Sequence, residues 1–214
     1  MNYFIDFDHT LYNTRLLINR MLLELAKYIA EQNNIDFQNV FNDLQSTFNH
    51  GKNGINDIYK LIEELSHSSN YNFDKKKANT IIDNVLLYGN NFLYEDSISF
   101  LKYLKSHGNM IYILSYNEND LYFQSIKIAG SGILEFVDGV IPTTVLKGNM
   151  PLDFENSVFI DDKPEDLISI YNQKPKKIYR IRRIDETYSN KETNLSILEY
   201  TSLSHLEKCL KMEE

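Results

Sequence analysis

Residues 4–12 read Phe-Ile-Asp-Phe-Asp-His-Thr-Leu-Tyr, an apolar start followed by two aspartates that are separated by one residue. This pattern predicts a strand that begins at Asn2 and buries residues 3–5. Asp6 and Asp8 would then lie at the carboxyl end of the strand, where open α/β sheets bind their ligands. Two carboxylates at such a place indicate metal-assisted chemistry.

Length and composition limit the kind of protein to which this strand can belong. With 214 residues, the chain is long enough for one substantial α/β domain with a small insertion, but not for two large domains. Hydrophobic residues make up 43% and charged residues 24%, which is typical of a globular protein. The single cysteine, Cys209, excludes an internal disulfide framework and a cysteine-rich metal site, as expected in a reducing cytosol.

Charge and hydropathy exclude further classes of partner. The formal net charge of −8 argues against a general nucleic-acid-binding protein, which needs a positive field to meet phosphate backbones. No apolar run approaches the roughly 20 residues that span a bilayer, and the chain starts without a basic, cleavable leader. We therefore expect a cytoplasmic protein without membrane or nucleic-acid partners, either a monomer or a weak homodimer.

The segment from residue 14 to residue 93 has the apolar spacing of helices almost throughout. Turn-forming residues separate four apolar stripes. These stripes cover residues 17–29, 40–48, 55–65 and 81–86. We predict that residues 14–93 form a compact four-helix element inserted just after the first strand.

The rest of the chain alternates predicted helices and strands, which is the pattern of a parallel sheet with helices on both faces. Strands are expected at residues 110–114, 136–141, 157–160 and 177–184, and helices at 95–107, 119–129, 166–171 and 203–210. The predicted fold class is thus α/β, with a Rossmann-like parallel sheet core formed by residues 1–13 and 94–214. Ser115 follows one of these strands and Asp161-Asp162 follows another.

The order of these polar residues resembles the haloacid dehalogenase (HAD) superfamily. Four motifs carry the resemblance, in the order Asp6-x-Asp8-x-Thr10, Ser115, Lys147 and Asp161-Asp162. The inserted helices resemble the helical cap of the family's subclass I, of the phosphatase type. In such proteins, substrate choice is expected to reside in the cap, because the motifs of the core are shared.

The resemblance implies a phosphatase that hydrolyses a small phosphorylated metabolite, such as a nucleotide or sugar monophosphate. Asp6 would attack phosphorus and form an aspartyl-phosphate intermediate. Asp8 would protonate the leaving oxygen and then activate water. Ser115 would donate a hydrogen bond to the phosphoryl group, and Lys147 would neutralise its charge while orienting Asp6.

The resemblance also implies a bound Mg²⁺, since an anionic nucleophile needs a cation to approach a phosphate dianion. Its ligands would all be oxygens: the carboxylate of Asp6, the main-chain carbonyl of Asp8 and a carboxylate of Asp162 or, as second choice, Asp161. Two further residues are candidates for substrate binding. Asn117 could add a donor after Ser115, and Lys52, in a loop of the predicted cap, could contact an anionic group.

Several alternatives stay open at this point. Lys127 and Lys163 compete with Lys147 for the role of the motif lysine, and Asp166 is expected to be mainly structural. A sugar phosphomutase would use the same motifs, and a non-catalytic regulatory or binding protein could keep the fold. A dehalogenase is disfavoured, since that reaction needs neither Asp8 nor Mg²⁺.

A basic run between Lys174 and Arg183 invites a polyanion-binding interpretation. Its charges alternate with isoleucines, however, and charged residues on an edge strand discourage pairing between sheet edges. We therefore predict that residues 177–184 form an edge strand rather than a polyanion-binding patch.

Overall fold

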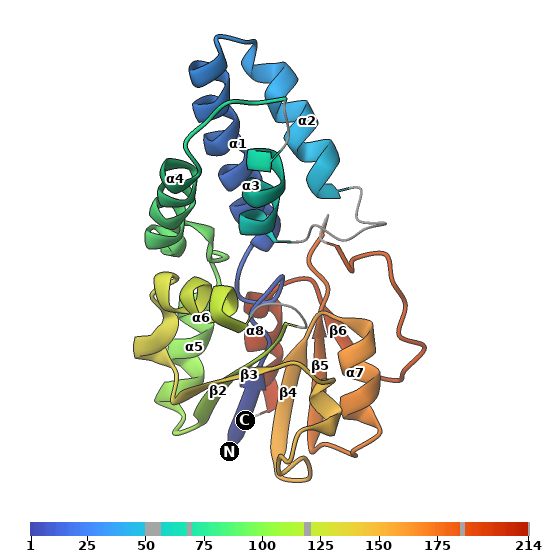
Figure 1. Ribbon diagram of the computed structural model, residues 1–214. Helices are drawn as coiled ribbons and strands as arrows, with labels where there is room; N and C mark the ends of the chain where they lie inside the picture. Colours follow the sequence, from blue (N-terminus) through green and yellow to red (C-terminus); the bar gives the residue numbers. More distant parts are fainter. Residues whose placement is uncertain (50–56, 68–69, 118–120, 185–186, 214) are drawn as a thin grey trace. The chain divides into compact units, whose positions relative to one another are not determined.

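The computed structural model describes residues 1–49, 57–67, 70–117, 121–184 and 187–213 (Figure 1). The chain divides into two compact units. Met1–Thr14 and Asn90–Glu214 form one of them, which we call the α/β unit. Arg15–Gly89 form the other, which we call the helical unit.

In the described part of the α/β unit, six strands form one sheet in the order β3-β2-β1-β4-β5-β6, and every neighbouring pair is parallel. The strands are β1 (Asn2–Ile5), β2 (Met110–Tyr116), β3 (Gly139–Thr143), β4 (Ser157–Asp161), β5 (Lys177–Ile181) and β6 (Leu198–Tyr200). β1 is central, and its residues 3–5 are buried. The predicted parallel sheet and the predicted burial of these residues are confirmed.

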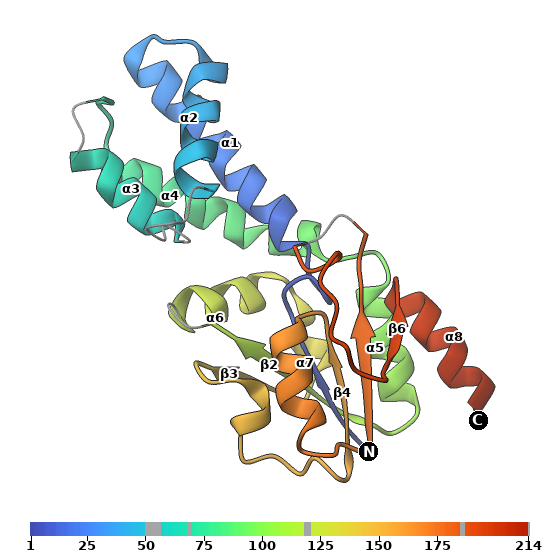
Figure 2. The same cartoon turned by 90° about the vertical axis from the view of Figure 1, so that its right-hand side faces the viewer.

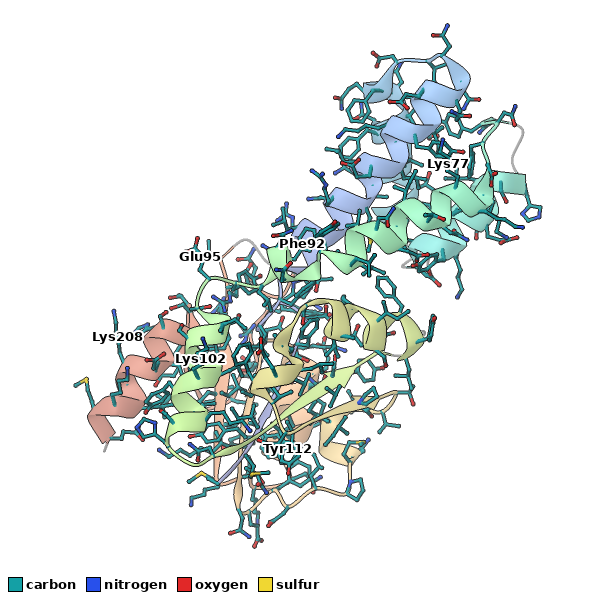
Figure 3. All side chains as sticks on the ribbon, turned by 90° about the vertical axis from the view of Figure 1, so that its left-hand side faces the viewer. Lys77, Phe92, Glu95, Lys102, Tyr112 and Lys208 are labelled. Atoms are coloured by element: carbon teal, nitrogen blue, oxygen red, sulfur yellow. The ribbon has the colours of Figure 1, made fainter. Side chains whose placement is uncertain are left out.

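Helices cover both faces of the sheet. Figure 3 looks onto the face that carries α5 (Ser97–Ser106), α6 (Leu121–Gly130) and α8 (Leu203–Glu213). α7 (Pro164–Tyr171) lies against the opposite face (Figure 2). Short 3₁₀ turns are η1 (Gly89–Phe92), η2 (Ile133–Phe136) and η3 (Lys147–Asn149).

Stacked aromatic rings form the core between α7 and the sheet. The ring centroid of Phe4 lies 5.1 Å from that of Phe159 and 5.3 Å from that of Tyr112. Phe154 stacks on Phe159 at 5.0 Å, and Ile170 of α7 belongs to the same cluster. Aromatic pairs with this spacing add to the free energy of simple apolar burial. This packing fixes β1 and β4 side by side, with their carboxyl ends level.

The predicted edge strand at residues 177–184 is wrong. β5 ends at Ile181 and pairs with β4 on one side and with β6 on the other, so it is an interior strand. Arg180 is fully buried, and Arg183 is nearly so. The two arginines of the basic run are therefore internal, whereas Lys174, Lys176 and Lys177 are exposed. The three-residue β6 was too short to be recognised from its apolar pattern. The predicted strand 136–141 also starts too early, because Phe136 ends η2.

The helical unit contains, among its described residues, α1 (Thr14–Asn33), α2 (Phe37–Asn49), α3 (Ile58–His67) and α4 (Lys75–Leu87). The predicted stripes fall on these helices wherever the structure describes them; the third begins at Ile55, which lies outside the described residues, and continues in α3. Asp74 caps α4 by accepting hydrogen bonds from the main-chain N–H groups of Lys76 and Lys77. Within the described ranges, none of the helices has the length and apolar character required to cross a membrane.

Candidate active site

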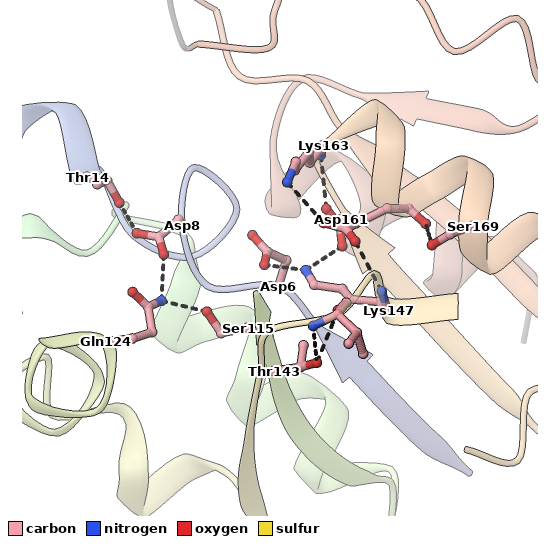
Figure 4. A network of polar contacts seen from close by, with 12 residues as sticks. Asp6, Asp8, Thr14, Ser115, Gln124, Thr143, Lys147, Asp161, Lys163 and Ser169 are labelled. Atoms are coloured by element: carbon pink, nitrogen blue, oxygen red, sulfur yellow. Dashed lines mark hydrogen bonds and ion pairs between the residues drawn. The ribbon is translucent and has the colours of Figure 1, made fainter. Parts of the chain in front are cut away.

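Three adjacent strands bring the predicted site residues to one edge of the sheet (Figure 4). Ile5 of β1 is level with Ile113 of β2 and Ile160 of β4. The next residue of each strand continues this register, and the N–H of Asp6 donates to the carbonyl of Ile160 at 2.8 Å. Asp6 and Asp161 are therefore neighbours because of strand register alone.

Lys147 connects the two aspartates. Its Nζ lies 2.5 Å from Oδ1 of Asp6 and 2.6 Å from Oδ2 of Asp161, and its side chain is almost fully buried. Burial opposes the charge on this amine, but the carboxylates of Asp161 and Asp6 outweigh it and raise the pKa of Lys147. Of the three lysines that competed in the sequence, Lys147 is the one that pairs with Asp6.

The short turn η3 holds Lys147 in place through main-chain contacts with α7. The N–H of Lys147 donates to Oδ1 of Asp166 at 3.1 Å, and the N–H of Gly148 donates to Oγ of Ser169 at 3.0 Å. A Cβ atom at Gly148 would lie 2.1 Å from the carbonyl oxygen of Ser169. Only glycine lets η3 approach α7 this closely, and no pattern in the sequence singles out Gly148 or Ser169.

Asp6, Asp161 and Asp162 form a buried carboxylate cluster whose candidate ligand atoms lie within 4.8 Å of one another. Both oxygens of Asp161 are engaged, one by Lys147 and one by the N–H of Lys163 at 2.9 Å. Oδ2 of Asp162, in contrast, is buried without a hydrogen-bond partner. Of the two acids at the carboxyl end of β4, Asp162 is thus better placed to bind a cation.

Among the described residues, Lys147 is the side-chain cation that pairs with this cluster, and it does not balance three carboxylates. Burial raises the pKa of Asp6, and the nearby Lys147 offsets this only in part. Burial likewise raises the pKa of Asp161 to about 7 and that of Asp162 well above its ordinary value, and mutual repulsion with Asp6 adds to both shifts. One ammonium among three carboxylates leaves room for a cation, and an all-oxygen donor set fits a hard divalent ion such as Mg²⁺.

Asp8 lies apart from this cluster and has different partners. Its Oδ1 accepts hydrogen bonds from Thr14 and Lys127, and its Oδ2 accepts one from Gln124 at 2.6 Å (Figure 4). Burial acts to raise the pKa of Asp8, but the charge of Lys127 and the three hydrogen bonds outweigh it and lower the pKa. Asp6 and Asp8 are therefore two carboxylates in opposite electrostatic environments.

Ser115 is fully buried at the end of β2, and its Oγ accepts a hydrogen bond from Gln124 at 2.5 Å. The sequence did not single out Gln124, and it offered Lys127 only as a competitor of Lys147. The one available signal was their spacing of three residues on a predicted helix, which places both side chains on one face.

For Asn117 and Lys52, the two remaining candidates from the sequence, substrate binding stays a prediction. The N–H of Asn117 donates to the carbonyl of Thr143 at 2.9 Å, which fastens this residue to the end of β3. Lys52 lies outside the described residues. His9 adopts a positive φ of 59°, a conformation in which glycine is more common, and its ring lies edge-on to that of Tyr188.

Comparisons with known proteins identify the fold. No protein-family model and no curated protein sequence matches the chain. Solved structures do match over nearly the whole length, each at low sequence identity. A HAD phosphatase from Thermococcus onnurineus is 16% identical with a TM-score of 0.62, and the match covers 98% of this chain and 97% of that one.

Two further structures match equally widely. YfnB from Bacillus subtilis, bound to magnesium, is 15% identical with a TM-score of 0.59, and the match covers 98% of this chain and 97% of that one. L-2-haloacid dehalogenase from Xanthobacter autotrophicus, with chloropropionic acid covalently bound, is 12% identical with a TM-score of 0.58 and 98% coverage of both chains. The chain therefore has the fold of the haloacid dehalogenase superfamily.

Proposed function

We propose that the protein is a Mg²⁺-dependent phosphatase that hydrolyses a small phosphorylated metabolite through an aspartyl-phosphate. The observation that carries this proposal is the unequal pair at the end of β1. Asp6 contacts Lys147 beside the acidic cluster, whereas Asp8 accepts hydrogen bonds from Thr14, Gln124 and Lys127 of the same unit. Two carboxylates with separate environments suit two roles, one as nucleophile and one in proton transfer.

In this mechanism, the carboxylate of Asp6 attacks phosphorus and displaces the alcohol of the substrate. The ammonium of Lys147 keeps Asp6 oriented and offsets negative charge on the phosphoryl oxygens. The hydroxyl of Ser115 donates to one of these oxygens. Asp8 gives a proton to the leaving oxygen, and in the second step it takes a proton from the water that releases phosphate.

A cation at the acidic cluster would be held by Asp6 and Asp162, together with the main-chain carbonyl of Asp8. When bound, Mg²⁺ supplies the positive charge that lets an anionic nucleophile approach a phosphate dianion. The unpartnered Oδ2 of Asp162 and the raised pKa values of the cluster support this assignment. Asp161, whose oxygens are both engaged, would instead hold Lys147 in place.

The neighbouring structures include a phosphatase and a dehalogenase, so the fold alone does not select the reaction. A dehalogenase needs a nucleophilic aspartate but no second carboxylate and no divalent cation. Asp8 and the cluster around Asp162 therefore favour the phosphatase. By its place in the chain, between β1 and α5, the helical unit is the part that we propose to act as the substrate-selecting cap.

The test is phosphate release from a panel of sugar and nucleoside monophosphates, with Mg²⁺ or with a chelator. We expect turnover that requires Mg²⁺, falls by more than about 10³-fold in Asp6→Asn and falls by about 10²- to 10⁴-fold in Asp8→Asn. Asp153→Asn, an exposed aspartate of the same unit, serves as the matched control. Halide release from 2-chloropropionate that needs Asp6 but neither Asp8 nor Mg²⁺ would instead establish a dehalogenase.

A further inference from the structure

Two polar side chains of α6, those of Gln124 and Lys127, contact Asp8. Gln124 and Lys127 are separated by three residues, so they lie on one face of the helix. Their exposed fractions are only 1% and 3%. Buried glutamine and lysine side chains are uncommon unless they are paired, because desolvation of a polar group or a charge costs free energy. Both of these side chains bind Asp8.

The amide nitrogen of Gln124 makes two contacts in the site, which Figure 4 draws. Nε2 lies 2.6 Å from Oδ2 of Asp8 and 2.5 Å from Oγ of Ser115. An amide nitrogen has two N–H donors and no acceptor, whereas an ionised carboxylate only accepts. The opposite orientation of the amide would bring its oxygen against the carboxylate of Asp8, so Asp8 determines which way Gln124 faces.

This orientation also determines what the hydroxyl of Ser115 can do. Because Gln124 donates to Oγ of Ser115, the hydroxyl acts as acceptor in that contact and keeps its hydrogen for another partner. That is the arrangement needed to donate to a phosphoryl oxygen. One amide group thus prepares the phosphate donor and holds the proton-transfer carboxylate at the same time.

Lys127 holds the other oxygen of Asp8, together with Thr14. Its ammonium lies 5.6 Å from the ring centroid of Phe7 and 5.7 Å from that of Phe123. The nearly buried ammonium of Lys127 thus has aromatic rings as neighbours and the carboxylate of Asp8 as its anionic partner. The Asp8 carboxylate is therefore held from both oxygens, and α6 supplies a donor to each.

We propose that Gln124 and Lys127 are positioning residues of the hydrolysis, with the Gln124 amide coupling Asp8 to Ser115. The inference rests on the proposed function, since it gives Asp8 and Ser115 the roles assigned there. The contacts of these two residues in the site are with Asp8 and Ser115, and we assign neither of them a contact with the substrate. Their effect on the reaction is exerted through Asp8 and Ser115, which is what distinguishes positioning from a direct catalytic role.

The first test is a double-mutant cycle on turnover. Gln124→Met keeps the size of the side chain but removes both donors, and we expect it to lower kcat by about 10- to 100-fold. In an Asp8→Ala, Ser115→Ala background the same substitution should change the residual kcat less than about twofold, because both acceptors of Gln124 are gone. An equal loss in both backgrounds would overturn the proposal. Gln173→Met, an exposed glutamine of the α/β unit, is the control.

Lys127 is tested in the same way. Lys127→Met alone leaves Asp8 without its ion-pair partner and could impair folding, so it is also combined with Asp8→Asn. We expect the single variant to lower kcat and the Asp8→Asn background to abolish that effect. If Lys127→Met reduced kcat equally in the Asp8→Asn protein, a role through Asp8 would be excluded.

The second readout does not need turnover. Binding of inorganic phosphate to the Mg²⁺-loaded protein, measured by calorimetry, should weaken about 5- to 10-fold in Gln124→Met, and should not weaken further when Ser115→Ala is already present. Unchanged phosphate binding in Gln124→Met would contradict the coupling to Ser115. Native protein that binds phosphate with this dependence but releases none from any ester would refute the proposed function, and of the present proposal it would retain only the coupling of Gln124 to Ser115.

Discussion

The guanidinium of Arg180 donates from Nε to the main-chain carbonyl of Asp162 at 3.3 Å, which links β5 to the acidic turn after β4. The same fully buried side chain donates to the carbonyls of Tyr188 and Lys191 at 2.8 and 2.7 Å and pairs with Glu199 of β6 at 2.9 Å. One arginine therefore holds the proposed metal ligand Asp162, the segment that follows β5, and the edge strand β6.

Replacing Arg180 should destabilise the α/β unit and disturb the site together. Arg180→Met leaves the main-chain carbonyls of Asp162, Tyr188 and Lys191 without this donor and Glu199 with Arg182 as its remaining partner, and we expect a loss of about 2–4 kcal/mol in the free energy of unfolding. Arg182→Met, whose ion pairs with Glu192 and Glu199 are more exposed, should lower the free energy of unfolding less than Arg180→Met does. Urea denaturation measures both, and equal losses would contradict the internal role of Arg180.

Gly148 offers a test of how Lys147 is delivered to Asp6. In Gly148→Ala the new Cβ meets the main chain of Ser169, which cannot yield as a side chain can. We expect η3 to move away from α7, at a cost of about 1–3 kcal/mol, with loss of the Lys147–Asp6 contact and of turnover. Gly139→Ala is the matched control, because its Cβ would meet only the side chain of Tyr112, at 3.3 Å. Full activity of Gly148→Ala would refute this account.

The arrangement of the acids could be predicted from the sequence because a parallel sheet brings the carboxyl ends of its strands together. The alternating elements predicted the sheet, and Asp6, Ser115 and Asp161 all occupy the ends of adjacent strands. Once the strand order is known, the closeness of these three residues follows. The helices of the helical unit could also be predicted, because the apolar spacing of a helix is a local pattern in the sequence.

Contacts that depend on the packing of distant segments could not be predicted. Gln124 has no local feature that points to Asp8, which is 116 residues away in the chain. A charged side chain such as that of Arg180 is expected in solvent. It is instead buried, because its partners come from a later turn and from the three-residue β6. The sequence around Gly148 likewise contains no sign of its role, because that role depends only on how closely α7 packs against η3.

Asp96 is expected to contribute strongly to stability from a position far from the site. It precedes α5, pairs with Arg183 at 2.7 Å and accepts hydrogen bonds from the N–H groups of Leu203 and Ser204, which begin α8. Asp96→Ala would leave the nearly buried Arg183 without its ion-pair partner and remove the acceptor of the N–H groups of Leu203 and Ser204, at an expected cost of about 3 kcal/mol. The adjacent, exposed Glu95→Ala should stay within about 0.5 kcal/mol. Similar denaturation midpoints for the two variants would contradict this.

The raised pKa values of the acidic cluster predict how pH and Mg²⁺ act on stability. A carboxyl whose pKa is higher in the folded than in the unfolded protein contributes stability at low pH, and this contribution is lost as the pH rises through the folded value. For Asp161 that value is about 7, and the pKa of Asp162 is raised as well. Without metal, the melting temperature should therefore rise when the pH is lowered from 8 to 5.

Bound Mg²⁺ should reverse this dependence, because cation binding competes with protons for the same carboxylates. The gain in melting temperature on adding Mg²⁺ should be larger at pH 8 than at pH 5, and it should disappear in Asp162→Asn but persist in Asp153→Asn. Asp8 does not oppose the trend, since its lowered pKa places its own loss of stability below the ordinary aspartate range. A gain that is equal at both pH values, or that survives in Asp162→Asn, would show that Mg²⁺ binds elsewhere.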